Sequence, residues 1–388
     1  MRARESGSGA LKVLMLSHYF AARGGGIELV AAELAQQLRA LGIEVTWLAT
    51  GTPDASGRGR HRAATLPASL VLERLLAIPY PVLMPAAWRL IFREARGADV
   101  VLVHDALYLS SVAGFLASRL HRRPLVVVQH VGLVPYQSTL LRVLMRAATR
   151  LIARPMLRLA ARVIFISQLT MDSFSTVRWC HAPILIFNGV DIAVFSPPES
   201  AGEVEEARGA LKLPLAAPVV LFVGRFVEKK GLAIMERIAR QHADLVFAFA
   251  GRGPLSPARW QLPNVRVYDS LSGPSLAALY RASDVLLLPS VGEGFPLVIQ
   301  EALACGLRVI CGADTARADA SAAPLLRGLE VDLHQPEATA ARFSRELSQS
   351  IAQRSSAAER RERFQFAEHH YSWKSTAASY AEILRALV

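Results

Sequence analysis

Short apolar runs alternate along the first half of the chain with longer stretches of helical spacing. The runs have the length of buried strands and lie at residues 11–16, 43–49, 100–103, 125–128, 163–166 and 184–187. Between the first two runs, apolar residues recur at helical spacing from Leu29 to Leu41, and Gly42 ends the pattern. A strand, a glycine-rich turn, a helix and a second strand predict the opening of a doubly wound parallel sheet.

The same alternation begins again in the second half. Strand-length runs lie at residues 219–223, 246–250, 265–267, 285–288 and 307–310, the last clear strand, and the pattern is helical from about residue 336. A stretch with Pro, Ser and Gly at residues 193–202 is typical of an interdomain linker. We therefore expect an α/β protein with two Rossmann-like, doubly wound parallel-sheet domains at residues 10–192 and 203–370, after a polar, disordered leader at residues 1–9.

The net charge of +12 comes entirely from the first half of the chain. Residues 1–190 contain 22 Lys and Arg against 10 Asp and Glu, whereas residues 191–388 contain 22 of each. No acidic residue occurs between Asp105 and Asp172. This asymmetry predicts that the first domain faces something anionic, such as a membrane surface, a phosphorylated acceptor or a nucleic acid.

Apolar run lengths and cysteine usage narrow the class of protein further. Every apolar run is far shorter than the ~18 residues of a membrane-spanning helix, and residues 11–16 are too few for a signal-peptide core. We therefore expect a cytoplasmic protein. Cys180, Cys305 and Cys311 are odd in number and lack metal-type spacing, so they predict neither a disulfide framework nor a zinc site.

One segment combines two carboxylates with the start of a helix. Glu293-Gly294-Phe295-Pro296 follows the run at residues 285–288, and Glu301 lies about two turns into the expected helix. Free N–H groups at a helix N-terminus favour an anion, and two separated carboxylates can hold different parts of one elongated ligand. The alternative is a solvated glutamate beside an ordinary capped helix.

A second segment combines a glycine turn with cations. Gly224 and Arg225 follow the run at residues 219–223, and Lys229, Lys230 and Gly231 end the turn. Arg225 suits bidentate contact with a phosphate and Lys230 acts as a point charge, each charge-assisted bond contributing roughly 1.5–3 kcal/mol. We expect Lys229 to face solvent. The alternative is a basic surface loop.

These segments, with several weaker ones in the same order, resemble the family 4 glycosyltransferases, which are retaining enzymes of the GT-B fold. The weaker pieces are Gly25-Gly26-Ile27-Glu28, Asn188-Gly189-Val190-Asp191, Ala250-Gly251-Arg252-Gly253-Pro254, Ser283-Asp284-Val285, Pro289-Ser290 and Ala302-Leu303-Ala304-Cys305-Gly306. Each piece alone is common, but the ordered set over residues 11–310 is specific. Tyr371-Ser372-Trp373 also matches, and the resemblance implies that a last helix at about residues 371–388 completes the first domain.

The resemblance implies a donor site for a nucleotide-diphosphate sugar, which is a co-substrate, and no cofactor. Arg225 and Lys230 would bind the diphosphate and stabilise its charge as the sugar leaves. Glu301 would bind the ribose hydroxyls, and Glu293 would contact the transferred sugar. Further donor contacts would come from the backbone at Gly25, Gly26, Gly224, Gly294, Phe295 and Leu297.

The resemblance also implies a histidine near the reacting carbon. His130 follows the run at residues 125–128, where the family often has a histidine, and His104 and Asp105 follow another strand towards the same cleft. The alternative for each is a structural residue with satisfied hydrogen bonds. Transfer would retain the anomeric configuration, with the leaving diphosphate accepting the acceptor's proton. No Asp-x-Asp motif occurs, which is consistent with a site that uses no metal ion.

Three positions depart from the family pattern. Val267-Tyr268-Asp269-Ser270 lacks the usual glycine, Arg308 stands where a proline is usual, and residues 311–323 lack the common Gly-rich turn and glutamate. These departures concern the contact to the nucleotide base and leave the phosphate contacts intact.

Residues 138–162 contain an arginine at every fourth position. On a helix these arginines would form a slowly winding basic stripe beside leucine and valine residues, and Pro155 would kink or split the helix. A basic amphipathic helix is typical of a membrane-surface segment, which predicts an anionic membrane as partner and a lipid-linked or lipopolysaccharide-type acceptor. The alternative is a helix with its basic face in water. The arginines are Arg142, Arg146, Arg150, Arg154, Arg158 and Arg162.

The sequence therefore favours a hexosyltransferase-type enzyme that uses a UDP- or GDP-linked sugar in cell-surface polysaccharide or lipopolysaccharide synthesis, peripheral to the inner face of the cell membrane. The alternatives are a nucleotide-sugar epimerase, a phosphorylase of the same fold and an inactive binding relative. A basic nucleic-acid-binding protein is a remote alternative, because no nucleic-acid module is recognisable. The glycines at residues 24–26 do not form Gly-x-Gly-x-x-Gly, which argues against a dehydrogenase. The sugar, the base, the acceptor and the linkage are left open.

Overall fold

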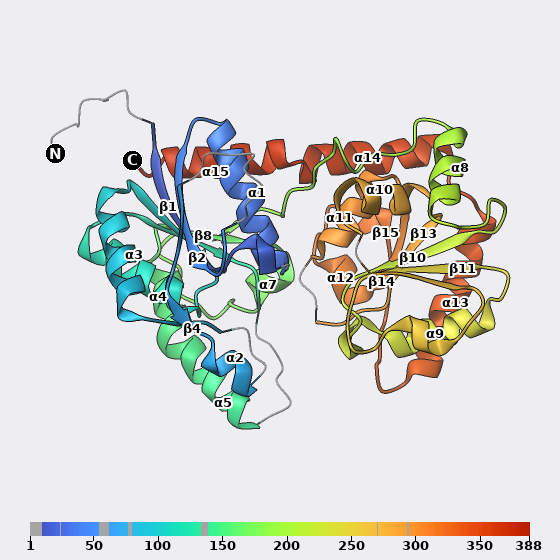
Figure 1. Cartoon of the computed structure of the whole chain (residues 1–388), viewed down its shortest axis with the longest axis horizontal. Coiled ribbons are helices and arrows are strands. Elements are labelled where there is room, and N and C mark those ends of the chain that lie inside the picture. Colours follow the sequence, from blue (N-terminus) through green and yellow to red (C-terminus); the bar gives the residue numbers. More distant parts are fainter. Residues whose placement is uncertain are drawn as a thin grey trace. The chain divides into compact units, whose positions relative to one another are not determined.

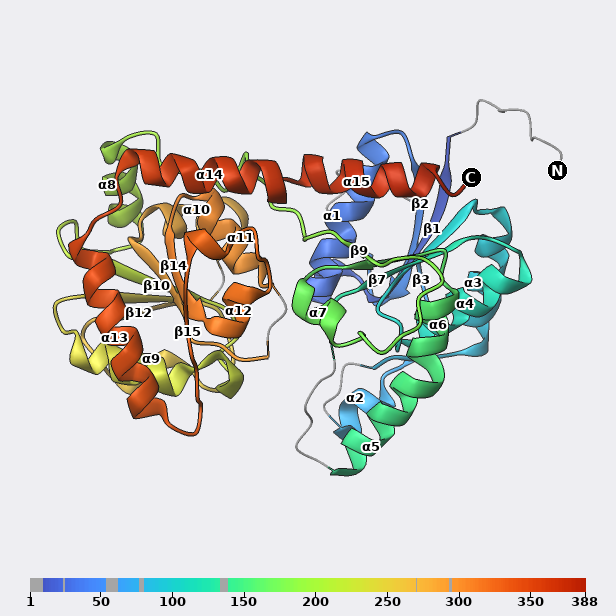
Figure 2. The same cartoon turned by 180° about the vertical axis from the view of Figure 1, so that it is seen from behind.

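The chain folds into two compact units. The computed structural model describes residues 10–23, 25–53, 62–76, 80–132, 139–269, 271–292 and 295–388. Unit 1 comprises Met1–Asn188 and Trp373–Val388, and unit 2 comprises Gly189–Ser372. Each unit is built on a parallel sheet with helices packed against it (Figure 1, and from behind in Figure 2). The α/β class with two parallel-sheet domains is therefore confirmed.

Unit 1 contains a seven-stranded sheet in the order β3-β2-β1-β6-β7-β8-β9. All neighbouring strands in it are parallel. The strands are β1 (Lys12–Tyr19), β2 (Glu44–Thr50), β3 (Arg62–Thr65), β6 (Val100–His104), β7 (Leu125–Gln129), β8 (Arg162–Phe165) and β9 (Ile184–Leu185). A separate antiparallel pair joins β4 (Ala68–Ser69) and β5 (Val82–Leu83).

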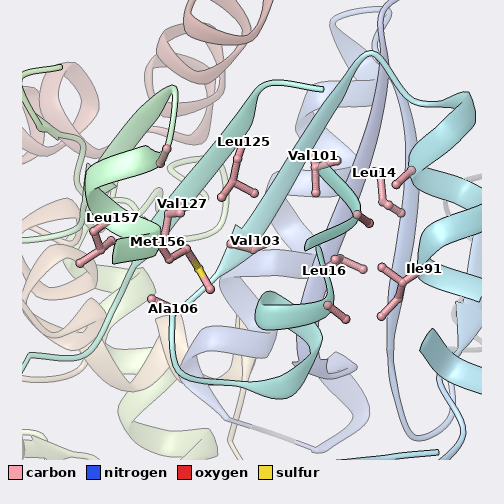
Figure 3. Packing of buried hydrophobic residues seen from close by; sticks show 14 of the residues in the cluster. Leu14, Leu16, Ile91, Val101, Val103, Ala106, Leu125, Val127, Met156 and Leu157 are labelled. Atoms are coloured by element: carbon pink, nitrogen blue, oxygen red, sulfur yellow. The ribbon is translucent and has the colours of Figure 1, made fainter. Parts of the chain in front are cut away.

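The helices and short helical turns of unit 1 surround this sheet, and several of them bury apolar residues against it. They are η1 (Ala21–Arg23), α1 (Gly26–Ala40), α2 (Val71–Leu76), α3 (Pro85–Gly97), α4 (Leu109–Leu120), α5 (Thr139–Ala148), the π-helical turn η2 (Thr149–Ala153), α6 (Arg154–Leu159), α7 (Gln168–Asp172) and α15 (Trp373–Arg385). Figure 3 shows the cluster in which Leu14 and Leu16 of β1 lie near Ile91 of α3, while Val127 of β7 lies near Met156 of α6. On the opposite face, α1 packs against α15.

Unit 2 contains a six-stranded parallel sheet in the order β12-β11-β10-β13-β14-β15. Its strands are β10 (Val219–Val223), β11 (Val246–Ala250), β12 (Val265–Tyr268), β13 (Val285–Leu288), β14 (Arg308–Gly312) and β15 (Leu326–Leu329). Its helices are α8 (Ala201–Ala210), η3 (Glu228–Lys230), α9 (Leu232–Gln241), η4 (Pro257–Trp260), α10 (Gly273–Arg281), α11 (Leu297–Ala304), α12 (Ala313–Arg317), η5 (Ala323–Leu325), α13 (Pro336–Ala352) and α14 (Ala357–Tyr371).

The edge strands are where the sequence prediction is incomplete. β3 and β15 were not predicted, and β15 follows the run at residues 307–310, which is the last clear strand in the sequence pattern. β3 has no buried residue and β15 has only Leu326 buried, because an edge strand is covered less than a central one. Neither strand therefore carries the apolar run by which the central strands are recognised.

The register of β1 against β6 positions several polar residues of unit 1. Leu14 pairs with Val101 and Leu16 pairs with Val103. His18 and Asp105 each follow two residues later, so they lie at the same end of neighbouring strands. In parallel sheets this carboxyl end is the edge where ligands bind.

Replacing Leu16 with Ala tests the packing of unit 1. Leu16 is fully buried, and a Cβ on Gly114 of α4 would collide with its side chain, so there is no room for the core to collapse far. A Leu→Ala change at such a site costs about 2–5 kcal/mol. Urea unfolding should show a loss of this size, whereas Leu151→Ala, at a 73% exposed leucine, should stay within about 0.5 kcal/mol of the parent chain. Equal losses in the two variants would contradict the assignment of Leu16 to the core.

Candidate functional site

The predicted cationic turn of unit 2 follows β10 directly. Gly224 has a φ of 150°, and a Cβ there would lie 3.6 Å from the Lys230 Nζ, so the lysine side chain runs alongside the glycine backbone. Lys230 is buried, whereas Arg225 and Lys229 are exposed. The exposure of Lys229 confirms the prediction made for it. One turn therefore carries a buried and an exposed cation at the carboxyl edge of the sheet.

This turn is joined to the turns that follow β11 and β13. Gly231 closes it with a φ of 72°, and a Cβ there would collide with the carbonyl oxygen of Pro289 at the end of β13. Only glycine accommodates both the left-handed conformation and this close approach. Backbone hydrogen bonds link the three turns: Gly224 N to Ala250 O (3.0 Å), Phe226 N to Arg252 O (2.8 Å) and Val291 N to Lys229 O (2.9 Å).

Glu301 lies on α11, the helix that follows β13. The Tyr280 hydroxyl donates to its Oε2 at 2.8 Å and also lies 3.2 Å from the carbonyl oxygen of Val298. Burial raises the pKa of Glu301 from 4.5 to about 7, although the hydrogen bond from Tyr280 acts in the opposite direction. At neutral pH this carboxyl group is therefore close to its titration midpoint, and a ligand that donates hydrogen bonds to it favours the ionised form.

The remaining predicted donor contacts fall around the start of α11. The Phe295 ring is buried and its centroid lies 5.6 Å from that of Tyr371, so its side chain belongs to the core and only its backbone is available to a ligand. Leu297 is the first residue of α11, after Pro296 in the N-cap position. Glu293 and Gly294 lie outside the described residues, so their predicted contacts stay predictions.

In unit 1, Gly25 and Gly26 begin α1, and a carboxylate of the chain itself lies beside them. Gly25 is the N-cap, and a Cβ on it would collide with the carboxyl group of Glu28. Glu28 is buried and its Oε1 lies 3.0 Å from the Nε2 of His18, which is also buried. The absence of a side chain at Gly25 thus allows Glu28 to fold back over the start of the helix and reach His18.

His104 and His130 form a buried pair at the ends of β6 and β7. The His104 Nδ1 lies 2.8 Å from the His130 Nε2. Burial lowers the pKa of His130 from 6.5 to about 3, and burial likewise holds the pKa of His104 well below its ordinary value. Both rings are therefore neutral at physiological pH. One ring can donate a hydrogen bond to the other, but neither supplies positive charge.

Asp105 fixes the chain around this pair. Its Oδ1 accepts hydrogen bonds from the Gln129 side chain (2.9 Å) and from the backbone N–H groups of His130 (2.9 Å) and Val131 (3.1 Å). Burial raises the pKa of Asp105 from 3.8 to about 6, although the two backbone hydrogen bonds lower it. The structure thus brings the predicted residues His104, Asp105 and His130 together in unit 1.

His18 is the residue of this cluster that the sequence analysis did not single out. It lies at the end of an apolar run, as His104 and His130 do, and this shared position was the available signal. Its ring stacks on Tyr108, with the centroids 3.8 Å apart and the planes 3° from parallel. Its contact with Glu28 joins β1 to α1, and no local sequence pattern predicts that contact.

The predicted basic helix is present as α5, η2 and α6 in succession. Arg146, Arg150 and Arg158 are exposed and Arg154 is half-buried, while the side chain of Arg142 lies outside the described residues. The regular helix changes to a π-helical turn just before Pro155, which stands in the first turn of α6. Within the described ranges, no helix combines the length and apolar character needed to cross a membrane.

The chemistry of each unit follows from these groups. Unit 2 offers cations and a titratable carboxyl group at one sheet edge, which suits a ligand with both anionic groups and hydroxyls. Unit 1 offers neutral imidazoles and carboxylates. Over the part of the chain that the structure describes, no group of three or more His, Cys, Asp or Glu residues could hold a metal ion.

Replacing Glu301 with Gln should change how stability depends on pH. Since the folded chain holds this proton more tightly than the unfolded chain, the contribution of Glu301 to the free energy of unfolding is full below pH 4.5 and is lost as the pH rises to about 7. Glutamine titrates in neither state. The melting temperature of Glu301→Gln minus that of the parent chain should therefore be larger at pH 8 than at pH 5, by roughly 2–4 °C for each kcal/mol involved.

Thermal unfolding at the two pH values measures this difference. Glu205→Gln, at an exposed glutamate on α8, is the matched control and should shift the melting temperature equally at both. An equal shift for Glu301→Gln at pH 5 and pH 8 would contradict the raised pKa.

Comparison with known proteins agrees with this architecture. The family model Glycosyltransferase Family 4 matches residues 24–194, and the model Glycosyl transferases group 1 matches residues 217–349. The chain is 33% identical over 249 residues to D-inositol 3-phosphate glycosyltransferase 1 of Catenulispora acidiphila. That match covers 55% of this chain and 56% of the relative, so the chain spans about half the length of this relative.

Solved structures of low sequence identity share the whole fold. The chain resembles Alr3699/HepE of Anabaena in complex with UDP, with a TM-score of 0.72 and 19% identity, covering 97% of this chain and 100% of that one. It also resembles WaaG, a glycosyltransferase involved in lipopolysaccharide biosynthesis, with a TM-score of 0.67 and 14% identity, covering 96% of this chain and 99% of that one. With one family model matching in each half of the sequence, the chain belongs to the family 4, group 1 glycosyltransferases of the GT-B fold.

Proposed function

We propose that this chain is a retaining, metal-independent hexosyltransferase that moves a sugar from a nucleotide-diphosphate sugar to a glycan or lipid-linked acceptor. The observation that carries the proposal is the carboxyl edge of the unit 2 sheet. Lys230 and Arg225 lie in the turn after β10, Glu301 lies on the helix after β13, and hydrogen bonds join the two turns. A nucleotide sugar has a diphosphate that needs cations and a ribose that donates hydrogen bonds, which matches this order of groups.

In this proposal cationic side chains of the protein neutralise the diphosphate, which is the role that a metal ion has in other enzymes. Arg225 and Lys230 stabilise the negative charge that grows on the diphosphate as the bond to the sugar breaks. The leaving diphosphate accepts the proton of the attacking hydroxyl on the face that it leaves, so the anomeric configuration is retained. His130, which burial keeps neutral, provides a hydrogen bond near the reacting carbon and no positive charge.

Two of the similar structures support a choice of substrates. HepE was solved with UDP, which favours a uracil nucleotide over a guanine nucleotide for the donor. WaaG takes part in lipopolysaccharide biosynthesis, which favours a cell-surface glycan or its lipid-linked precursor as the acceptor. We place the reaction at the cytoplasmic face of the cell membrane.

Nucleotide binding tests the donor site. UDP, GDP and ADP should be compared by thermal shift, and one of them should raise the stability of the chain by about 2.7 kcal/mol at a hundredfold excess over its dissociation constant. Arg225→Ala and Glu301→Ala should each weaken binding, roughly tenfold to a hundredfold, because each removes a charged partner of the nucleotide. Lys230→Ala should do the same.

Lys229→Ala is the matched control for Lys230→Ala. The two lysines are adjacent and carry the same charge, but only Lys230 lies against Gly224. Equal losses at the two positions would mean that the nucleotide senses only the overall charge of the loop. If none of the nucleotides changes the melting temperature, the proposed donor site is contradicted.

The exposed face of α5, η2 and α6 supports peripheral binding to an anionic membrane. Leu144 and Leu151 are 59% and 73% exposed, and Val143 and Ile152 are also exposed beside the arginines. Burying one leucine in the acyl region contributes about 1.5–3 kcal/mol, and each arginine near anionic lipid adds about 1 kcal/mol. A solvated helix face has no comparable reason to carry large apolar side chains between its arginines.

Vesicle co-sedimentation tests the membrane surface. The chain should sediment with vesicles that contain phosphatidylglycerol and stay in the supernatant with pure phosphatidylcholine, since the arginines require negative charge. Leu151→Asp and Arg150→Gln should each reduce sedimentation severalfold at low salt. Leu215→Asp and Arg259→Gln, at exposed positions of unit 2, should not. A chain that remains in the supernatant with both kinds of vesicle has no such surface.

A further inference from the structure

We propose that Tyr280 is a positioning residue of the donor site, which holds the carboxyl group of Glu301 in the orientation that receives the ribose hydroxyls of the nucleotide. The inference rests on the proposed function, because it takes Glu301 as a nucleotide contact. It goes further by assigning a role to a residue that no ligand touches and by joining that role to the linker at residues 193–202. It is carried by the hydrogen bond between the two side chains and by the contacts of the linker with α10.

The exposure of the two side chains separates their roles. Tyr280 is fully buried, so a ligand cannot reach its hydroxyl group. Glu301 is half-buried, and one of its carboxyl oxygens, Oε2, already accepts the hydrogen bond from Tyr280. Within the part of the chain that the structure describes, the other oxygen, Oε1, accepts no hydrogen bond. Tyr280 therefore acts on a ligand only through Glu301, whose Oε1 is the oxygen left for the ribose hydroxyls.

The tyrosine hydroxyl is a donor held in one place. Burial raises the pKa of Tyr280 well above 10, and the neighbouring Glu301 raises it further, so the hydroxyl keeps its hydrogen at every physiological pH. The nearer acceptor is the Glu301 Oε2 at 2.8 Å, while the carbonyl oxygen of Val298, one turn earlier on α11, lies at 3.2 Å. A carboxyl group with one oxygen bound in this way is already ordered, which reduces the entropy that a ligand must remove on binding.

Packing alone does not account for a tyrosine at this position. A phenylalanine would fill the same space without removing a hydroxyl group from water. Burial raises the pKa of Glu301 to about 7, and the hydrogen bond from Tyr280 lowers it. The bond thus favours the carboxylate, which only accepts hydrogen bonds and so matches the hydroxyl donors of a ribose.

The linker contacts α10 at the tyrosine itself and at the residue after it. The ring of Phe195 meets that of Tyr280 edge-on, with the centroids 5.8 Å apart and the planes 78° from parallel. Arg281 donates to the carbonyl oxygen of Val194 at 3.1 Å and pairs with Glu203 of α8 at 2.8 Å. The place of the tyrosine hydroxyl therefore depends on the linker, and a linker held against α10 keeps the donor carboxylate oriented.

Tyr280→Phe tests the role because it removes the hydroxyl group and keeps the ring. The measurement is the affinity of the full chain for UDP and for dideoxy-UDP, which lacks both ribose hydroxyls, by titration calorimetry. The ratio of the two affinities reports the contact with the ribose hydroxyls. We expect Tyr280→Phe to lower this ratio about threefold to tenfold, as for the loss of roughly one hydrogen bond, and to leave the affinity for dideoxy-UDP within about twofold. Tyr380→Phe, which removes a buried hydroxyl from unit 1, is the control and should change neither affinity.

The pH profile of the same ratio separates positioning from a general loss of structure. In the parent chain the ratio should rise as Glu301 ionises near pH 7. In Tyr280→Phe this rise should move to higher pH, because the bond that lowers the pKa of Glu301 is gone. Cys305, at the end of α11, interacts electrostatically with both Glu301 and Arg281. Burial raises the pKa of the Cys305 thiol, so neither it nor the arginine changes charge in this range.

Phe195→Leu tests the connection to the linker. It should lower the ratio of affinities by about twofold in the parent chain and by nothing further in Tyr280→Phe, because the linker acts through the tyrosine hydroxyl. Losses that add in the double variant would contradict this connection.

The outcomes distinguish this inference from the proposed function. The role of Tyr280 is overturned when Tyr280→Phe leaves the ratio and its pH profile unchanged, or when both affinities fall in parallel, because the variant then acts through the fold. It is also overturned when the parent chain binds UDP and dideoxy-UDP equally, since Glu301 then has no ribose contact to make. A parent chain that binds neither nucleotide contradicts the proposed function instead.

Discussion

Parallel pairing of the strands is the constraint on which both sites depend. Because every strand of the two large sheets runs in the same direction as its neighbours, each sheet collects the turns that leave its strands at one edge. In unit 2 these turns must also pass close to one another. Gly231 lies so near the Pro289 carbonyl that no side chain fits, and the backbone of each turn bonds to the next. The conformation of the cationic turn is thus fixed by the neighbouring turns at the same edge of the sheet.

The two units differ in the polar groups at the carboxyl edges of their sheets. At the carboxyl edge of its sheet, unit 2 buries the cation Lys230 and holds the carboxyl group of Glu301, whose raised pKa reflects the cost of removing it from water. Unit 1 gathers histidines and carboxylates and keeps its two innermost rings neutral.

The central strands and the cationic turn were predictable because each is local. A run such as residues 219–223 must be buried on both faces of a parallel sheet, and the turn that follows it can be located from the sequence alone. β3 and β15 escaped prediction because edge strands need little apolar surface. His18 escaped because its importance arises from Glu28 on another element, and Glu28 reaches it only because Gly25 lacks a side chain. The contact between His18 and Glu28 depends on the folded structure, and the only trace of it in the sequence is the short spacing between Gly25 and Glu28.

The π-helical turn η2 has a consequence for the arginines around it. In a regular α-helix, residues four apart are displaced by about 40° around the axis, so a long series of them winds away from any one face. A π-helical turn is wider and rotates less per residue, which offsets part of that winding. η2 lies between Arg146 and Arg154, so the series winds less around the axis over this turn than over the flanking α-helical segments. The wider hydrogen-bonded turn thereby narrows the arc around the helix axis over which these arginines are spread.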